Sequence, residues 1–195
     1  GMPSQACIST NAHALARYSA ICQEQGLVPI IEPEVLMDGD HDAQRCYDVT
    51  AEILDATFAA CAEQGVHIPG ALLKPNMVMA GTDCSNQATR EEVAQLTVDC
   101  LTNHVPHNLP GIVFLSGGQS SKAATAHLNT MNALYDNLPW ELSFSYGRAL
   151  QAAPLKAWGG YPANLVAGQK AFYHRALCNS AARTGRYGAD MENTA

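Results

Sequence analysis

Lys74 has the sequence context of a reactive amine. It ends the apolar segment 70–73 and is followed by Pro75 and Asn76. A lysine at the end of a buried strand is unfavourable unless its charge is used or removed, and the uncharged amine is a nucleophile. Catalytic groups of (β/α) barrels lie at this end of a strand. The pattern indicates a lysine that forms a Schiff base; a surface lysine with a packed aliphatic stem is the alternative.

Glu32 and Glu34 follow another apolar segment, 27–31, and could supply the proton transfers that imine chemistry needs. A carboxyl group beside a lysine can give a proton to the departing hydroxyl and later take one from water. A structural ion pair with Lys74 is the alternative interpretation.

Two glycine turns that follow strands have the composition of phosphate sites. They are Ser116-Gly117-Gly118 and Ser145-Tyr146-Gly147-Arg148. Glycine lets backbone N–H groups face an anion at the start of the next helix, and an arginine can clamp a phosphate. One such turn is also explained as an ordinary tight turn, but two on consecutive strands are more specific.

These residues are expected at one rim of a parallel sheet. Strands are predicted over 27–32, 71–74, 111–116 and 141–145, although Pro29 weakens the first of them. Their ends at Glu32, Lys74, Ser116 and Ser145 are 42, 42 and 29 residues apart, which leaves room for a crossover helix each time. The fold class is therefore α/β, with four polar groups converging at the carboxyl ends of the strands.

The expected helices alternate with these strands. A first helix is predicted over about 8–25, a second ends near Gly65, and a third opens with the capping box of Thr89 and Glu92. A fourth includes 123–131. A last helix over about 163–182 is expected to face inward with its apolar residues, which are Leu165, Phe172, Ala176 and Leu177.

Composition restricts the class of protein. The chain of 195 residues suffices for a single domain over 1–195, and its net charge of −7 argues against nucleic acid and anionic membranes as partners. No apolar stretch approaches a membrane span of about 20 residues and no signal peptide is recognised.

The seven cysteines are odd in number and form no CxxC pair, which favours a cytoplasmic protein with reduced thiols. Gly1 before Met2 is interpreted as an added residue, and 186–195 as a loose tail.

No metal site is predicted. The acidic segment 38–42 resembles the start of a calcium loop, but its sixth position is Ala43 and its twelfth is Val49. We interpret it as a solvated entry to the second helix. His104 and His107 flank Pro106 and lack partners with the spacing of zinc ligands.

Taken together, these segments resemble the class I (Schiff-base) fructose-bisphosphate aldolases. The matching stretches run in family order and are 27–34, 38–42, 72–78, 115–120, 144–151 and 155–160. The resemblance implies that Lys74 forms the imine, that Glu32 shuttles protons and that Glu34 is a second active-site glutamate that helps to prepare Glu32 for this role. It also implies that Ser116, Gly117 and Gly118 bind one phosphate, and that Ser145, Gly147 and Arg148 bind the other. The implied glycolytic lyase reaction cleaves fructose 1,6-bisphosphate reversibly without a cofactor or metal, because the iminium accepts the electrons.

The resemblance begins near Pro3 and covers the C-terminal half of the family's barrel, without the C-terminal tyrosine. It implies about four β/α units of a TIM-type barrel. A homodimer is one hypothesis for closing it, with the Glu32 strand of one copy beside the Ser145 strand of the other; an open sheet covered by helices is the alternative. A remnant that only binds sugar phosphates is the alternative function.

Overall fold

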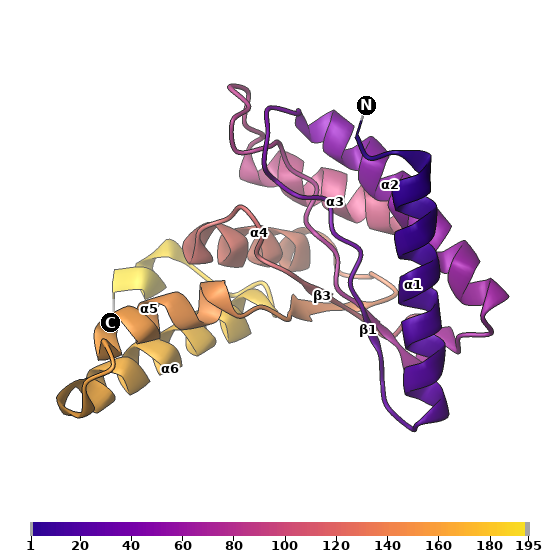
Figure 1. Ribbon diagram of the computed structural model, residues 1–195. Coiled ribbons are helices and arrows are strands. Elements are labelled where there is room, and N and C mark those ends of the chain that lie inside the picture. The colour runs from indigo at the N-terminus through magenta and orange to yellow at the C-terminus, as the bar shows by residue number, and fades with distance from the viewer. Residues whose placement is uncertain (1, 194–195) are drawn as a thin grey trace.

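The computed structural model describes residues 2–193 and shows helices alternating with short strands (Figure 1). The interpretations of Gly1 and of the last two residues of the tail concern positions outside this range. The elements are α1 (Gln5–Glu24), β1 (Ile30–Ile31), α2 (Ala43–Glu63), β2 (Leu72–Leu73), α3 (Arg90–His104), β3 (Gly111–Phe114), α4 (Ser121–Leu134), β4 (Glu141–Phe144), α5 (Arg148–Trp158) and α6 (Leu165–Ala182). Short 3-10 turns cover Ile68–Gly70, Pro162–Asn164 and Ala189–Asn193.

The four strands form one parallel sheet in the order β1-β2-β3-β4, as predicted. Leu73 pairs with Ile31 on one side and with Ile112 on the other. β1 is shorter than expected, because Leu27 and Val28 are exposed and Pro29 has no N–H to donate. Pro29 still accepts a hydrogen bond from the Leu72 N–H at 3.0 Å. The segment therefore follows the sheet while only Ile30 and Ile31 form regular strand pairs.

The main core lies between the sheet and the helices. Its largest fully buried side chains include Ile31, Leu73, Ile112, Phe114 and Leu142 from the strands. Leu54, Leu101, Leu128 and Met131 cover them from α2, α3 and α4. Burial of such side chains is the principal stabilising contribution to the fold. Successive helices pack against one another, and Figure 1 shows α5 and α6 side by side on the far side of α4 from α1.

Local sequence signals account for several helix starts. The predicted capping box at α3 is confirmed: Thr89 N–H donates to Glu92 Oε2 at 2.7 Å, and Glu92 N–H donates to Thr89 Oγ1 at 3.3 Å. Asp42 caps α2 by accepting a hydrogen bond from the Arg45 N–H at 2.7 Å. The acidic segment 38–42 therefore leads into a helix, as interpreted from the sequence.

The C-terminal third differs from expectation. The sequence did not predict α5, and the predicted inward face of α6 was wrong. Leu165, Phe172 and Leu177 are 53%, 45% and 48% exposed, whereas Arg175 and Cys178 are buried. The expected loose tail is also wrong for residues 186–193, because Ala189–Asn193 forms a 3-10 turn that is tied to α6 by side-chain contacts.

Within residues 2–193, no helix has the combined length and hydropathy needed to cross a membrane.

Candidate active site at the carboxyl ends of the strands

Lys74 and Glu32 meet at the carboxyl end of the sheet. The Lys74 backbone N–H donates to the carbonyl oxygen of Ile31 at 2.7 Å, which holds the residue directly beyond β2. Its Nζ atom lies 2.9 Å from Glu32 Oε1, with the two side chains 19% and 45% exposed. The juxtaposition predicted from the strand ends is thus present. A proton can pass directly between the amine and this carboxylate, since 2.9 Å is hydrogen-bonding distance.

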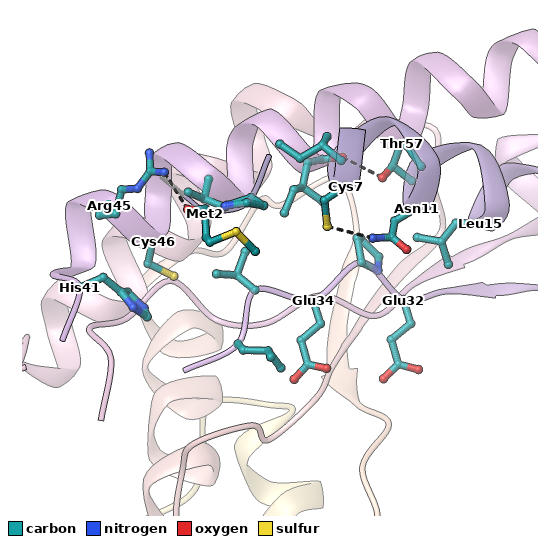
Figure 2. A pocket seen from close by; sticks show the side chains of 18 of the residues that line it. Met2, Cys7, Asn11, Leu15, Glu32, Glu34, His41, Arg45, Cys46 and Thr57 are labelled. Atoms are coloured by element: carbon teal, nitrogen blue, oxygen red, sulfur yellow. Dashed lines mark hydrogen bonds between the residues drawn. The ribbon is translucent and has the colours of Figure 1, made fainter. Parts of the chain in front are cut away.

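Glu34 lies against the loop that follows β3. A Cβ atom placed on Gly117 would be 2.9 Å from Glu34 Oε1, so a larger residue at 117 would displace this carboxylate. Among residues 2–193, Lys74 forms its ion pair with Glu32 and not with Glu34. Figure 2 shows the two glutamate side chains leaving one segment in the same direction. The structure therefore places the Glu34 carboxylate against the first glycine turn.

The turn after β3 requires glycine. Gly118 has φ +71°, and a Cβ atom there would lie 2.5 Å from the Met37 Cβ. The Gln119 N–H donates to the Ser116 carbonyl at 3.0 Å and closes the turn. Ser120 then caps α4 by accepting from the Ala123 N–H at 3.1 Å. The predicted serine-glycine turn therefore lies at a helix start, an arrangement suited to an anion.

The turn after β4 leads directly into α5. Ser145 N–H donates to the Phe114 carbonyl at 3.1 Å, so this residue continues the line of the strand. Gly147 occupies the N-cap position without a side-chain hydrogen bond to the helix. Arg148, the first residue of α5, is exposed, and no carboxylate within residues 2–193 forms an ion pair with it. The uncapped helix start and the arginine can together bind a phosphate.

Asn76 supports the site, a role that sequence analysis did not assign to it. Its side chain is 3% exposed, and its Oδ1 accepts a hydrogen bond from the Val35 N–H at 2.9 Å. Its Nδ2 donates to Thr50 Oγ1 at 3.2 Å and to the Met77 carbonyl at 3.1 Å. Asn76 thus ties the segment after β2 to the segment that carries Glu32 and Glu34. The available signal was a polar residue placed inside an apolar stretch, which indicates a buried hydrogen-bond partner.

An apolar pocket lies beside this site rather than at its reacting centre. It has a volume of about 680 Å³, is lined largely by α1, α2 and the segment after β1, and has Glu32 and Glu34 at its edge (Figure 2). Lys74 and Ser116 are not among its lining residues. The pocket lining also carries Ile8, Leu15 and Ile53, a composition unsuited to a phosphorylated sugar. The pocket is therefore distinct from the candidate site at Lys74.

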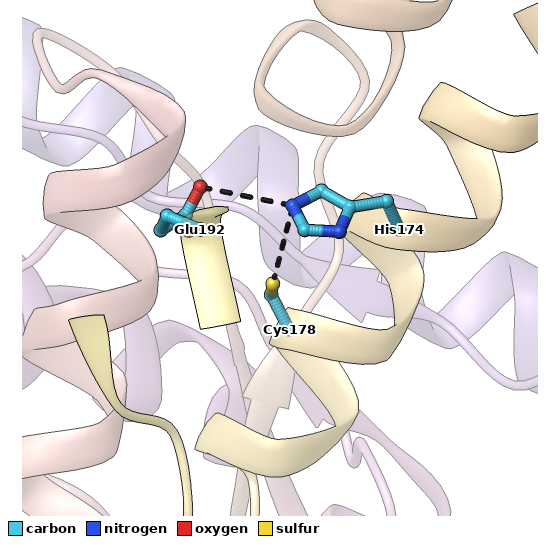
Figure 3. Close-up of side chains that lie close together, drawn as sticks. All are labelled: His174, Cys178 and Glu192. Carbon is cyan, nitrogen blue, oxygen red and sulfur yellow. Dashed lines mark hydrogen bonds and ion pairs between the residues drawn. The ribbon is translucent and has the colours of Figure 1, made fainter. Parts of the chain in front are cut away.

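A group of possible metal ligands lies elsewhere, on α6 and the C-terminal turn. His174, Cys178 and Glu192 each place one ligand atom within 4.8 Å of the others (Figure 3). The carboxylate of Glu192, however, already accepts two hydrogen bonds from Arg175, and Lys122 Nζ lies 3.6 Å away. Two cations beside the carboxylate oppose a divalent ion there. We interpret the group as part of a structural ion-pair network.

The comparisons with known proteins agree with the arrangement of strands and turns. Residues 1–195 match the family described as glycolytic, fructose-bisphosphate aldolase class-I. Fructose-bisphosphate aldolase of Dictyostelium discoideum is 55% identical over 185 residues, which are 95% of this chain and 52% of that protein. Fructose-bisphosphate aldolase B of Homo sapiens is 53% identical, with 95% and 51% covered. This chain therefore spans about half the length of these relatives.

A solved structure gives the same result for the fold. The aldolase of Plasmodium falciparum, determined in complex with TRAP and a small-molecule inhibitor, superimposes with a TM-score of 0.94 at 48% identity. The match covers 96% of this chain and 54% of that one. The four parallel β/α units are thus those of a half-barrel, as predicted. This chain belongs to the class I fructose-bisphosphate aldolase family.

Proposed function

We propose that this chain is a Schiff-base lyase that cleaves fructose 1,6-bisphosphate reversibly to dihydroxyacetone phosphate and glyceraldehyde 3-phosphate, a step of glycolysis. The observation that carries the proposal is the 2.9 Å contact between Lys74 Nζ and Glu32 Oε1 at the carboxyl ends of the strands. Two glycine turns also follow the next two strands. A lysine in a purely structural ion pair would not require such turns beside it. The family membership supports the same assignment.

In the proposed reaction, Lys74 attacks the substrate ketone after its proton has passed to Glu32. The resulting carbinolamine loses its hydroxyl as water when Glu32 returns the proton, and an iminium forms. Glu32, which is again a carboxylate, then takes the proton of the hydroxyl group on the carbon that becomes the aldehyde. The bond between this carbon and the carbon next to the iminium breaks, its electron pair moves to the iminium, which becomes an enamine, and the aldehyde is released. Protonation of the enamine carbon and hydrolysis of the imine release the ketone and restore the lysine. No metal is needed in this scheme, because the iminium is the electron acceptor.

The two turns are proposed to hold the two phosphates of the substrate. Ser116, Gly117 and Gly118 form the first site, at the start of α4; Ser145, Gly147 and Arg148 form the second, at the start of α5. The net charge of −7 disfavours binding of an anionic phosphate. The backbone N–H groups of the turns and the guanidinium of Arg148 provide the local positive charge that can bind it. Glu34, which touches the first turn, is proposed to hold Glu32 and this phosphate in a fixed relation.

Borohydride trapping tests the proposal directly. Incubation with dihydroxyacetone phosphate and sodium borohydride should leave one reduced adduct, mapped to Lys74 by peptide mass spectrometry. Lys74→Met should abolish it, whereas Lys170→Met, which alters an exposed lysine on α6, should not. An adduct spread over the exposed lysines, or none at all, would refute the assignment.

The alternative function is a sugar-phosphate binding protein without imine chemistry. It is favoured by one observation, that within residues 2–193 the Lys74 side chain forms an ion pair with Glu32 and makes no ion pair or hydrogen bond with a residue of either glycine turn. Calorimetric titration with dihydroxyacetone phosphate separates the two functions. Binding without a trapped adduct supports the alternative, and binding with an adduct supports the lyase.

For the 195-residue chain we also infer self-association. Within residues 2–193, β1 and β4 each pair with a strand on one side only. Phe172 and Leu177 of α6 are exposed apolar side chains on the C-terminal helices. Pairing of β1 with β4 of a second copy would satisfy both edges. Sedimentation velocity should show a dimer, and a compact stable monomer would refute the pairing.

The compartment proposed for this reaction is the cytoplasm. The seven cysteines are all unpaired, which supports a reducing environment. The acidic net charge supports a small anionic substrate held by local groups rather than a nucleic-acid or membrane partner.

A further inference from the structure

The side chain of Gln119 connects the first glycine turn to the loop that follows Lys74. Gln119 comes directly after Gly118, and its backbone N–H donates to the Ser116 carbonyl at 3.0 Å. Its side-chain Nε2 donates to Met77 Sδ at 3.5 Å. One residue therefore closes the turn with its backbone and reaches the loop after β2 with its amide.

The loop after β2 is the fixed side of this connection. Met77 is 1% exposed, and its carbonyl accepts a hydrogen bond from Asn76 Nδ2 at 3.1 Å. The next residue, Val78, donates its N–H to Thr97 Oγ1 on α3 at 2.9 Å. The two glycines of the turn, by contrast, have no side chains that could be held, and glycine has the greatest backbone freedom of all residues. The position of the turn therefore depends on flanking residues such as Gln119.

His127 of α4 holds the other end of the same amide. Its Nδ1 is 2.7 Å from Gln119 Oε1, although the two residues are eight positions apart in the chain. Burial lowers the pKa of His127 to about 4, so the imidazole is neutral at pH 7 and only one ring nitrogen carries a proton. Because Gln119 directs its oxygen to the histidine and its NH2 group to Met77, this proton is on Nδ1. The two contacts together restrict the amide to one orientation.

We propose that His127 is a positioning residue for the first phosphate turn and acts through Gln119. The Nδ1–H of His127 orients the amide, and the oriented amide holds Gln119 against the buried loop after β2. The backbone of Gln119 in turn closes the turn that contains Gly117 and Gly118. The inference rests on the proposed function for the identity of the ligand at this turn, whereas the contacts of His127 do not depend on it.

Asparagine and leucine at position 127 separate the hydrogen bond from the packing. The Nδ2 of an asparagine is as many bonds from Cα as the Nδ1 of a histidine, so His127→Asn keeps a donor in the same place. His127→Leu has the same branched shape as His127→Asn and lacks the donor. If His127 acted only by packing, both variants would behave alike. Positioning through Gln119 requires that asparagine keeps the function that leucine loses.

Calorimetric titration of the full chain with dihydroxyacetone phosphate measures this function. His127→Leu should weaken the affinity about fivefold, within the range for coupling through side-chain contacts, and His127→Asn should stay within about twofold of wild type. Unphosphorylated dihydroxyacetone offers Lys74 the same ketone without a phosphate. Its trapping by borohydride should therefore proceed at the same rate in all three proteins, whereas general destabilisation would reduce both binding and trapping.

His104→Leu is the matched control for loss of a histidine contact elsewhere. The Nδ1 of His104 lies 2.8 Å from Asp55 Oδ1 and connects α3 to α2, and neither residue belongs to a glycine turn or a strand end. The affinity for dihydroxyacetone phosphate should be unchanged in this variant.

Nuclear magnetic resonance tests the contact itself, without a ligand. In isotope-labelled protein at pH 7, the ring signals of His127, identified by their absence from His127→Asn, should show the proton on Nδ1. This measurement does not depend on the proposed function.

Three results would overturn the proposal: wild-type affinity in His127→Leu, equal losses of affinity in His127→Leu and His127→Asn, or a His127 proton on Nε2. A wild-type chain that binds dihydroxyacetone phosphate but traps no adduct would refute the lyase assignment alone, because the comparison of affinities still stands. A wild-type chain that does not bind dihydroxyacetone phosphate would overturn both the proposed phosphate sites and the role of His127.

Discussion

His127 should make stability depend on pH. It lies on α4, and its Nδ1 is 2.7 Å from the Oε1 of Gln119, a residue of the turn proposed as the first phosphate site. Burial, assisted by the charge of Arg90 and partly offset by Glu91, lowers the pKa of His127 to about 4. The histidine is therefore neutral at pH 7 and donates its Nδ1 proton to Gln119. Protonation would place a charge in a site that disfavours it.

The sign and size of the effect follow from this shift. In the unfolded chain a histidine has a pKa near 6.5, so below that pH the unfolded state binds a proton that the folded state does not. Stability from this group is complete above about pH 7 and is lost as the pH falls from 6.5 towards 4. The loss is about 2 kcal/mol between pH 8 and pH 5, and about 3 kcal/mol by pH 4. Glu192 contributes little between pH 8 and pH 5, since its lowered pKa removes stability mainly below about pH 4.5.

Urea unfolding of wild type and His127→Gln at pH 8 and pH 5 measures the effect. The variant should lose about 2 kcal/mol less between the two pH values than wild type does, because glutamine does not titrate. His13→Gln serves as the control, since His13 is exposed on α1, and it should keep the wild-type pH dependence. Equal pH dependence in wild type and His127→Gln would show that His127 is not held neutral by burial.

Three further changes test other parts of the site. Glu32→Gln should slow borohydride-dependent trapping about 100-fold or more, because the proton acceptor at 2.9 Å is lost; an unchanged rate would remove Glu32 from the chemistry. Gly118→Ala should weaken phosphate binding, because φ of +71° and the 2.5 Å approach to Met37 force the turn to move, at a strain of about 1–2 kcal/mol; a wild-type dissociation constant in calorimetry would contradict this. Asn76→Ala should lower the free energy of unfolding in urea by about 2–3 kcal/mol, since the partly buried Val35 N–H and the buried Thr50 hydroxyl lose their partner, and a change below 0.5 kcal/mol (on the order of a surface substitution) would refute it.

The sequence was informative where a polar residue follows an apolar strand. The ends at Glu32, Lys74, Ser116 and Ser145 depend on alternation of strand and helix, which local hydrophobic patterns encode. Because parallel strands bring their carboxyl ends to one rim, the contact between Lys74 and Glu32 followed from the order of elements alone.

The parts that could not be predicted depend on long-range packing. α5 contains Pro154 and starts after a glycine turn, both of which are local signals against a helix. On α6 the apolar residues suggested one buried face, yet the buried positions include Arg175. Its burial depends on Glu192, which lies 17 residues away. A periodicity analysis treats arginine as a surface residue, so it assigns the face that arginine occupies to solvent.

The site geometry itself depends on contacts that strand pairing does not supply. β1 and β2 contain two residues each, and the segments that carry Glu32, Glu34 and Lys74 extend beyond them. Asn76 holds the first of these segments through the Val35 N–H at 2.9 Å. Thr97 of α3 holds the chain further along by accepting a hydrogen bond from the Val78 N–H at 2.9 Å. Since a displacement of about 1 Å in a reacting group can reduce a rate about 100-fold, these buried side chains control the distance between amine and carboxylate as much as the sheet does.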